Sequence, residues 1–340
     1  YIRDTKDMLM AGQTLPGVYG ASSPRMNVAD LRTKGWEASV TWGDSFTLAS
    51  KPFNYRIMAG IGDNTSKVTK YDNPNRTLTD PYEGQQLGEI WGYVVDGYFK
   101  TDEEARNYKV DQSFVNQMIN ASALDNGLHA GDLKFVDLDG NNKIEQTTSA
   151  NDRKDMKVIG NSLPRYNYNF GISADWYGID FSVLFQGIGK QNWYPGAETS
   201  MFWGPYSRPY ASFIPSDFMS QVWSEENTNA YFPRPRGYVA LGSNRELAVV
   251  NTKYLQNLAY CRLKNLSIGY TLPDKWLSKI GFEKIRVYFS GENLLTFTKL
   301  HSDYIDPEQA SASNSWKTSK SDANIYPWAK TYSFGVDITF

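Results

Sequence analysis

The last ten residues, TYSFGVDITF (331–340), are the stretch that decides the fold class. Every second position holds a large apolar residue: Tyr332, Phe334, Val336, Ile338 and Phe340. A side-chain period of two is that of an extended strand with one apolar face and one polar face. Two environments suit such a strand, the half-buried sheet of a soluble β-sandwich and a wall between lipid and an aqueous lumen. This stretch alone leaves both open.

The amino-acid composition excludes several classes of protein and favours a β-protein. The 340 residues carry 35 Lys and Arg against 37 Asp and Glu, so no basic field is available for nucleic acid. The 23 Tyr, 17 Phe and 10 Trp suit a β-protein with long loops, including an outer-membrane barrel. No apolar run is long enough for a transmembrane helix. Cys261 is the only cysteine, which excludes an internal disulfide.

The same alternation recurs along the chain and predicts eight strands. We expect them at 1–10, 36–42, 55–61 with an extension towards residue 70, 166–176, 179–185, 266–272, 285–289 and 331–340. A strand-like piece is predicted at 90–99 and a helix at 111–121. Because the pattern opens inside a strand at Tyr1, we expect the C-terminal portion of a longer protein.

The connections between these strands alternate in length. Long ones are expected at 11–33, 71–162, 188–256 and 298–327, and short ones at 43–53, 177–178 and 273–281. Transmembrane barrels have short periplasmic turns and long extracellular loops. The alternation of long and short connections therefore predicts an all-β, antiparallel transmembrane β-barrel in a lipid bilayer. The regions 71–162 and 188–256 would be large extracellular loops, and the C-terminus would lie on the periplasmic side.

Several sequence blocks resemble one family. They are YCRLKNLSIGYTLPDKWLSKIGFEKIRVYFSGENLLTFTKL (260–300), the Asp306-Pro307-Glu308 triplet, GDLKFVDLDGNNKIE (131–145), VIGNSLPRYNYNFG (158–171) and VLFQGIGK (183–190). Together they resemble the SusC-like (RagA-like) TonB-dependent outer-membrane transporters of Bacteroidota, over essentially the whole chain. The resemblance extends only to the barrel part of that family.

The resemblance implies a barrel of about 22 strands around an N-terminal plug that this sequence does not contain. It implies import of oligosaccharides, or alternatively of peptides, driven by the TonB complex and assisted by a SusD-like surface lipoprotein. Three rivals stay open: a siderophore or cobalamin receptor, a passive or adhesive surface barrel, and a glycan-degrading β-sandwich enzyme. The sequence shows no nucleophile elbow, phosphate loop or cysteine–histidine pair, so we expect no enzyme and no required cofactor.

One acidic stretch resembles the first half of a calcium-binding loop. Alternate oxygen donors stand at Asp137, Asp139 and Asn141, and Lys143 offers a backbone carbonyl. The acid expected at the twelfth position is replaced by Thr148, and Glu145 or Asp152 would substitute for it. A structural Ca²⁺ that rigidifies an extracellular loop is one interpretation. The other is a metal-free turn.

Aromatic residues are dense in the 188–256 region. Those considered for contact with substrate or partner, together with one arginine, are Trp193, Tyr194, Trp203, Tyr206, Arg208 and Tyr210, with Phe202 and Phe213 nearby. Their rings would stack on sugar rings, form an interface with the SusD-like partner, or fill a small core of the loop itself. The alternating row from Tyr332 to Phe340 resembles the C-terminal signal that the outer-membrane assembly machinery reads.

Overall fold

The computed structural model describes residues 1–11, 17–20, 24–116, 127–207, 214–235, 240–242, 245–277, 281–310, 320–321 and 326–340. The strands are β1 (Ile2–Ala11), β2 (Arg25–Leu48), β3 (Lys51–Lys70), β4 (Glu89–Tyr93), β5 (Val95–Tyr98), β6 (Leu133–Phe135), β7 (Met156–Asn161), β8 (Arg165–Trp176), β9 (Ile179–Lys190), β10 (Asn192–Pro195), β11 (Gln256–Asn257), β12 (Tyr260–Thr271), β13 (Lys284–Thr298), β14 (Lys320–Ser321) and β15 (Thr331–Thr339). The helices are α1 (Asp102–Arg106), α2 (Ser200–Trp203) and α3 (Asp274–Leu277), with short 3₁₀ turns η1 (Gly17–Tyr19), η2 (Gly204–Tyr206) and η3 (Phe218–Gln221).

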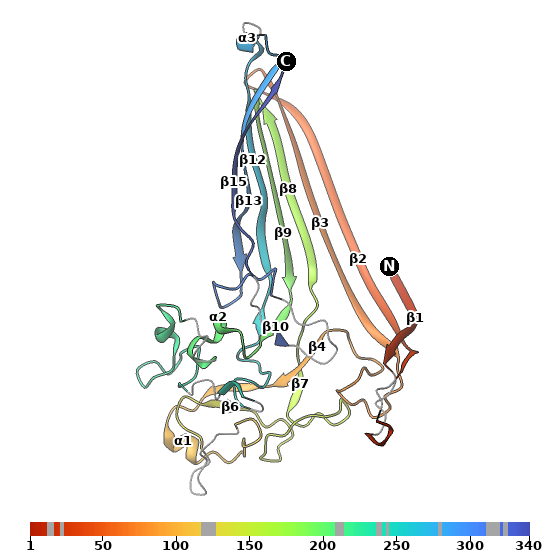
Figure 1. Cartoon of the computed structure of the whole chain (residues 1–340), viewed down its shortest axis with the longest axis vertical. Coiled ribbons are helices and arrows are strands. Elements are labelled where there is room, and N and C mark those ends of the chain that lie inside the picture. Colours follow the sequence, from red (N-terminus) through yellow and green to blue (C-terminus); the bar gives the residue numbers. More distant parts are fainter. Residues whose placement is uncertain are drawn as a thin grey trace.

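Eight long strands form one antiparallel sheet in the order β1-β2-β3-β8-β9-β12-β13-β15 (Figure 1). Neighbours in the sheet follow one another along the chain, with the long loops inserted between them. Within the described part of the chain, β1 and β15 are the two edges of this sheet and do not pair with each other. The predicted all-β antiparallel architecture is therefore confirmed. None of the described helices is long and apolar enough to cross a membrane.

The register separates the side chains into two faces across the whole sheet. On β15, Tyr332, Phe334, Val336 and Ile338 share one face, and Phe334 is 83% exposed on it. Their paired neighbours on β13 include Phe289, Val287 and Ile285, and the same face continues through Ile268, Phe181, Ile172, Ile57 and Trp42. We call this the apolar face. The opposite, polar face carries Asp337, Ser333, Ser290, Ser267, Ser182, Ser173 and Arg56.

Short and long connections lie at opposite ends of the sheet. The two-residue turns Ala49-Ser50 and Tyr177-Gly178 and the connector with α3 lie at the end that also holds the C-terminus, and the long connections gather at the other end (Figure 1). The sequence correctly predicted this alternation. The expected connection over 43–53 is wrong in extent, because Phe46 and Phe53 pair across the sheet and only Ala49 and Ser50 turn, both with positive φ.

Strand β2 corrects the loop predicted over 11–33, because it begins at Arg25 and pairs with β1 from there. Its 24 residues span roughly 80 Å when extended, against a hydrocarbon layer of about 30 Å. A small cluster of Ala29, Val68 and Tyr71 packs where β2 and β3 reach the long-loop end. Strand β2 is therefore longer than a hydrocarbon layer alone would require.

The predicted helix over 111–121 is also wrong in its described part, since residues 111–116 form a turn, and 117–121 lie outside the described residues. The helix of this region is α1 instead. Its N-cap, Thr101, accepts a hydrogen bond from the backbone N–H of Glu104, and three acidic residues occupy its first turn. Both features stabilise a helix start. In residues 111–116 the Asp111 carboxylate accepts from the backbone N–H of Ser113 at 2.9 Å, but the chain makes only a turn there. The strand-like piece predicted at 90–99 is confirmed as β4 and β5.

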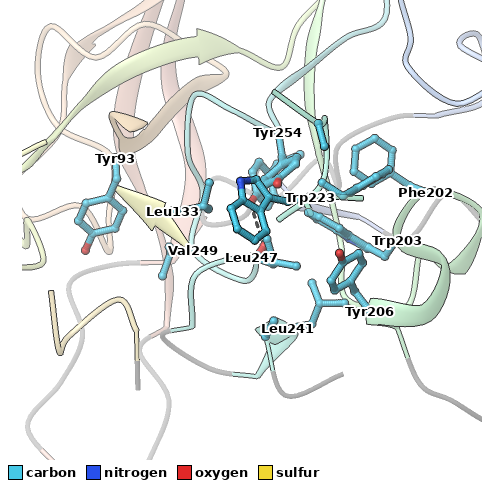
Figure 2. Close-up of a cluster of buried hydrophobic side chains, with 14 of the residues drawn as sticks. Tyr93, Leu133, Phe202, Trp203, Tyr206, Trp223, Leu241, Leu247, Val249 and Tyr254 are labelled. Atoms are coloured by element: carbon cyan, nitrogen blue, oxygen red, sulfur yellow. Dashed lines mark hydrogen bonds between the residues drawn. The ribbon is translucent and has the colours of Figure 1, made fainter. Parts of the chain in front are cut away.

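The main hydrophobic core belongs to the loops rather than to the sheet. It brings together Tyr93, Leu133, Trp203, Tyr206, Leu247 and Tyr254 with other residues from both large loop regions (Figure 2). Tyr98 and Tyr254 link the two regions by a hydrogen bond of 3.0 Å between their hydroxyl groups. The two long loops therefore form one packed body at one end of the sheet, which we call the loop body.

Candidate functional site: the polar face and the loop body

The aromatic residues of the 188–256 region that the structure describes are buried inside the loop body. The side chains of Trp193, Tyr194 and Trp203 are 0% exposed, and that of Tyr206 is 1% exposed. Trp203 Nε1 donates to the carbonyl of Gly196 at 2.9 Å. Rings without exposed surface offer no platform for a sugar, so these four residues stabilise the loop body instead of contacting substrate. Arg208, Tyr210 and Phe213 lie outside the described residues.

The acidic stretch folds into a tight turn that gathers three carboxylates. Ligand oxygens of Asp137, Asp139 and Asp155 lie within 4.8 Å of one another. Asp155 is fully buried and accepts backbone N–H bonds from Leu138 at 2.8 Å and Glu145 at 2.7 Å. Burial raises the pKa of Asp155. Asp155, not the predicted Asp152, completes this cluster. No spacing pattern pointed to Asp155, because it lies beyond a twelve-residue loop that begins at Asp137.

The other predicted ligands in this turn are held by protein partners. Asn142 has a positive φ of 62°, a conformation that asparagine adopts more readily than most residues. Asn141 donates to Asp139 at 3.2 Å, and the Glu145 carboxylate lies 3.3 Å from Lys154 Nζ and 4.0 Å from that of Lys143. The hydrogen bond from Lys154 lowers the pKa of Glu145. Glu145 is therefore neutralised by lysines, and Ca²⁺ binding stays a prediction for the three aspartates.

Calcium titration tests that prediction. If the loop binds the ion, millimolar Ca²⁺ is expected to protect residues 137–155 from proteolysis and hydrogen exchange, because binding to the folded loop alone adds stability, about 2.7 kcal/mol at a hundredfold excess over Kd. Asp139→Asn is expected to abolish the protection and Asp152→Asn to leave it intact. Equal exchange with and without Ca²⁺ in the wild-type protein would show a metal-free turn.

The polar face carries two adjoining concavities near the loop body. The first, of about 370 Å³, lies over β2, β3 and β8 and is lined by Glu37, Ser39, Gly60, Gly62, Asn64, Asn167 and Asn169, with Tyr1 among the remaining residues. Gly60 is paired with Asn169 and Gly62 with Asn167, so the floor over β3 has no side chains at these two rows. We call this concavity the glycine trough.

The second concavity, of about 660 Å³, shares Asn167 and Asn169 with the glycine trough and extends over β9 and β12. Gln186 and Ile188 line its floor, and Pro307 and Glu308 line it from the loop side. The carboxamides of asparagine and glutamine both donate and accept hydrogen bonds. The two concavities together present a polar, largely uncharged surface to whatever occupies the space in front of the sheet.

A buried ion-pair cluster holds the 306–308 segment onto the polar face. Arg262 is 2% exposed and donates to Asp306 at 2.7 Å and Glu308 at 2.6 Å, and also to the Thr296 hydroxyl at 2.9 Å. Lys264 donates to Glu308 at 2.7 Å. The register shift of β12 between Leu263 and Asn265 leaves Lys264 unpaired in the ladder, which lets it join Arg262 on one side. We call Arg262, Lys264, Asp306 and Glu308 the anchor cluster.

Three other carboxylates of the polar face, those of Asp175, Asp180 and Asp337, are engaged in bonds between strands. Arg286 of β13 donates to Asp180 of β9 at 2.6 Å and to Asp337 of β15 at 3.2 Å, reaching over Gly269 of β12. Asn54 donates to Asp175 at 2.7 Å. These are structural pairs that tie strands together. Carboxylates that are held by neighbouring side chains in this way stabilise the polar face, and they do not form the free acid–base pair of a glycosidase.

The sequence of the chain is similar to those of TonB-dependent receptors. No family model matches the chain. It is 27% identical over 359 residues to the TonB-dependent receptor P3 of Formosa agariphila, covering 100% of this chain and 32% of that protein. It is 21% identical over 342 residues to the TonB-dependent receptor SusC of Bacteroides thetaiotaomicron, covering 100% of this chain and 29% of SusC.

Among solved structures, the chain is similar to the RagAB peptide importer in its open-open state. The TM-score is 0.68 at 20% sequence identity, with 100% of this chain and 32% of that chain covered. The closed-closed state gives a TM-score of 0.65. The sheet thus has the fold of the corresponding RagA barrel portion. The chain spans about a third of the length of the curated relatives it matches, and TonB-dependent receptors are transporters rather than enzymes, as expected from the sequence.

Proposed function

Because the chain belongs to the TonB-dependent receptors of the SusC/RagA type, we propose that it lines a channel for the TonB-dependent import of a polar oligomer across the outer membrane. The chain would form part of the wall of a closed barrel of about 22 strands, whose apolar face contacts lipid and whose polar face borders the lumen. The loop body would lie outside the cell and the C-terminus in the periplasm.

The separation of the two faces is the observation that carries this proposal. Along β15 the apolar residues Tyr332, Phe334 and Val336 are all more than half exposed, and the intervening Ser333 and Asp337 lie on the opposite face. In a soluble protein, an apolar face that extends over eight strands would be covered by a second layer. Lipid on one side and water on the other accounts for both faces of the sheet.

The loop body supports the proposed partner. Its long connections gather at one end of the sheet, where a SusD-like surface lipoprotein would cover the channel mouth (Figure 1). The similar RagAB structures are those of a peptide importer. We propose the same kind of two-protein assembly here, with the TonB complex acting on a plug domain outside this chain.

The structure changes the balance between the two substrate classes. The expectation of an oligosaccharide came from the family resemblance, and the rings considered for stacking on sugars, those of Trp193, Tyr194, Trp203 and Tyr206, are buried. The accessible polar face instead offers carboxamides, from Asn167, Asn169 and Gln186. Carboxamides match the hydrogen-bonding groups of a peptide main chain. We therefore favour oligopeptides, and oligosaccharides are the second candidate.

Uptake measurements on the full-length receptor with its lipoprotein test this function. Cells that produce the complex are expected to accumulate fluorescent oligopeptides only when TonB is present, and deletion of residues 1–340 is expected to abolish uptake. The protein is expected in the outer-membrane fraction and to need detergent for extraction. Uptake that persists without TonB would support the passive barrel. A receptor that takes up neither peptides nor oligosaccharides would refute the proposal.

The last strand gives a separate prediction about assembly. Phe340, 87% exposed at the end of the apolar row, is expected to be read by the assembly machinery together with Tyr332, Phe334, Val336 and Ile338. Deleting Phe340 is expected to lower the amount of heat-resistant, folded receptor several-fold without altering its relative preference among substrates. Deleting Tyr326, also 87% exposed but outside β15, is the control. Normal levels of folded receptor after removal of Phe340 would contradict this role.

A further inference from the structure

We propose that Arg32, Lys34 and Lys67 bind the phosphate groups of an anionic lipid in the membrane leaflet next to the loop body. We call these three residues the cation patch. The inference rests on the proposed placement of the chain in the outer membrane, and it adds a binding site and a ligand class that import itself does not require. Three properties of the patch support it: its place at the rim of the apolar face, its uncompensated positive charge, and a repulsive pair across two strands.

The cation patch begins directly beyond the last aromatic residue of the apolar row on β2. That residue is Trp36, 48% exposed, and Lys34 and Arg32 follow it on the same face at two-residue steps towards the long-loop end. The intervening Thr33 is buried on the opposite face, where its hydroxyl lies 2.6 Å from that of Ser66. Tryptophan rings at a barrel rim lie at headgroup level, and two strand residues advance ~6.6–6.8 Å. The patch therefore lies among the lipid headgroups.

The charge of the patch is only partly compensated. Arg32 donates to the Asp4 carboxylate at 2.7 Å and 3.0 Å, and both of these side chains are exposed. Lys34 and Lys67 are also exposed and form no ion pair with any residue that the structure describes. The residue bridged to Lys67 on its other side is Gln86, which carries no charge. Three positive charges therefore face one carboxylate.

Arg32 and Lys67 form a like-charge pair across β2 and β3. The two residues are Cα partners in the antiparallel register, and like charges directly opposite each other destabilise a sheet. Lys34 stands on the diagonal, with its Cα about 7–8 Å from that of Lys67. Water screens such repulsion well, and the border of a hydrocarbon layer screens it less. An anion between the three groups replaces this repulsion by attraction, and a phosphate offers several oxygens for charge-assisted hydrogen bonds.

The opposite rim of the same two strands lacks this arrangement. The charged residues that β2 and β3 place on the apolar face there are Asp44 and Lys51, one of each sign. The excess of positive charge therefore belongs to the leaflet next to the loop body. Because the apolar face begins immediately below the patch, a ligand that joins phosphate to acyl chains contacts both surfaces at once. This combination favours a lipid over a free phosphate ion.

Binding of fluorescent diphosphoryl lipid A to the full-length receptor–lipoprotein complex in neutral detergent tests the inference. The double variant Lys34→Gln/Lys67→Gln is expected to weaken binding roughly tenfold to thirtyfold, because each basic residue near a membrane surface adds severalfold to the affinity for anionic lipid. Lys51→Gln is the matched control, on the same face of β3 but at the other rim, and is expected to bind like the wild type. Asp4→Asn, which frees Arg32 from its carboxylate, is expected to bind more tightly.

Thermal stability gives a second measurement that needs no fluorescent label. Because Arg32 and Lys67 repel each other when no anion is bound, the ligand-free Lys67→Gln variant is expected to melt no lower than the wild type. Unlabelled diphosphoryl lipid A is expected to raise the melting temperature of the wild type by several degrees and that of the double variant by much less. Added salt is expected to weaken the effect on the wild type. Lysines with a purely structural role would lower the melting temperature of the ligand-free variant instead.

The outcomes separate this inference from the proposed function. Unchanged affinity for diphosphoryl lipid A in the double variant overturns the inference. So does equal binding of dephosphorylated lipid A by the wild type, which would show contact through the acyl chains alone. Inorganic phosphate that stabilises the complex as strongly as lipid A overturns the assignment to a lipid. Import by the same complex leaves the import function standing in all three cases, whereas a complex that is extracted without detergent and imports nothing refutes the import function itself.

Discussion

Arg262→Met is expected to release segment 299–310 from the sheet and to lower the free energy of unfolding of that region by about 3–5 kcal/mol. The guanidinium of Arg262 is the shared partner of Asp306 and Glu308, and both Arg262 and Asp306 have side chains no more than 5% exposed. Removal of the arginine leaves carboxylates in a water-poor site with only Lys264 beside Glu308. Hydrogen exchange of segment 299–310 in the assembled receptor measures the effect.

Two companion variants make this result interpretable. Lys264→Met is the milder control, because Lys264 is 18% exposed and Glu308 keeps Arg262. Adding Asp306→Asn and Glu308→Gln to Arg262→Met is expected to recover much of the lost protection, since no unpaired charge remains. Because Pro307 and Glu308 line the larger concavity, import is expected to fall with the single variant. Unchanged exchange in Arg262→Met would show that other contacts hold the segment.

Gly187→Ala is expected to abolish most of the folded receptor. On β9, Gly187 lies opposite Tyr168 and Cys261, and the ring of Tyr168 crosses it so that its hydroxyl donates to the carbonyl of Tyr260 at 3.0 Å. An added Cβ would overlap the Tyr260 carbonyl oxygen and lie 2.5 Å from the Tyr168 hydroxyl. Because the first of these atoms belongs to the backbone of a paired strand, the cost is expected to exceed the roughly 1–3 kcal/mol typical of overpacking.

Gly43→Ala provides the matched control within the same sheet. A Cβ on Gly43 would find its nearest neighbour, the carbonyl oxygen of Tyr55, at 3.4 Å, which is ordinary contact. Heat-modifiable mobility on gels reports the amount of folded receptor for both variants. Tyr168→Ala in the Gly187→Ala background removes the ring but not the backbone overlap, so only slight recovery is expected. Equal amounts of folded receptor for Gly187→Ala and Gly43→Ala would refute this account.

The parts of the fold that follow from local rules could be predicted from the sequence. Alternation identified the long strands of the sheet, and the Tyr177-Gly178 turn followed from its position between two alternating runs. Both of its residues adopt the positive φ that so short a connection needs. The two faces of the sheet also followed, because a period of two fixes which side chains share a face.

The parts that depend on contacts distant in sequence could not be predicted. Residues 25–33 pair as a strand because β1 and β3 flank them, and their pattern is broken by the register shift at Asp30 and Leu31. Asp155 joins Asp137 only after the chain has folded back on itself. The trough joins β2 and β3 to β8, whose lining residues Asn167 and Asn169 lie more than a hundred positions beyond those of β3. No local pattern carries such information.

The location of the hydrophobic core has a consequence for how receptors of this kind vary. The loop body keeps its own core of buried rings, while the sheet is held by ladder hydrogen bonds and by its surroundings. Substitutions in one part therefore leave the stabilising forces of the other largely unchanged. The loop body can therefore tolerate changes in its sequence and shape that leave the sheet, and the ladder that holds it, unaltered.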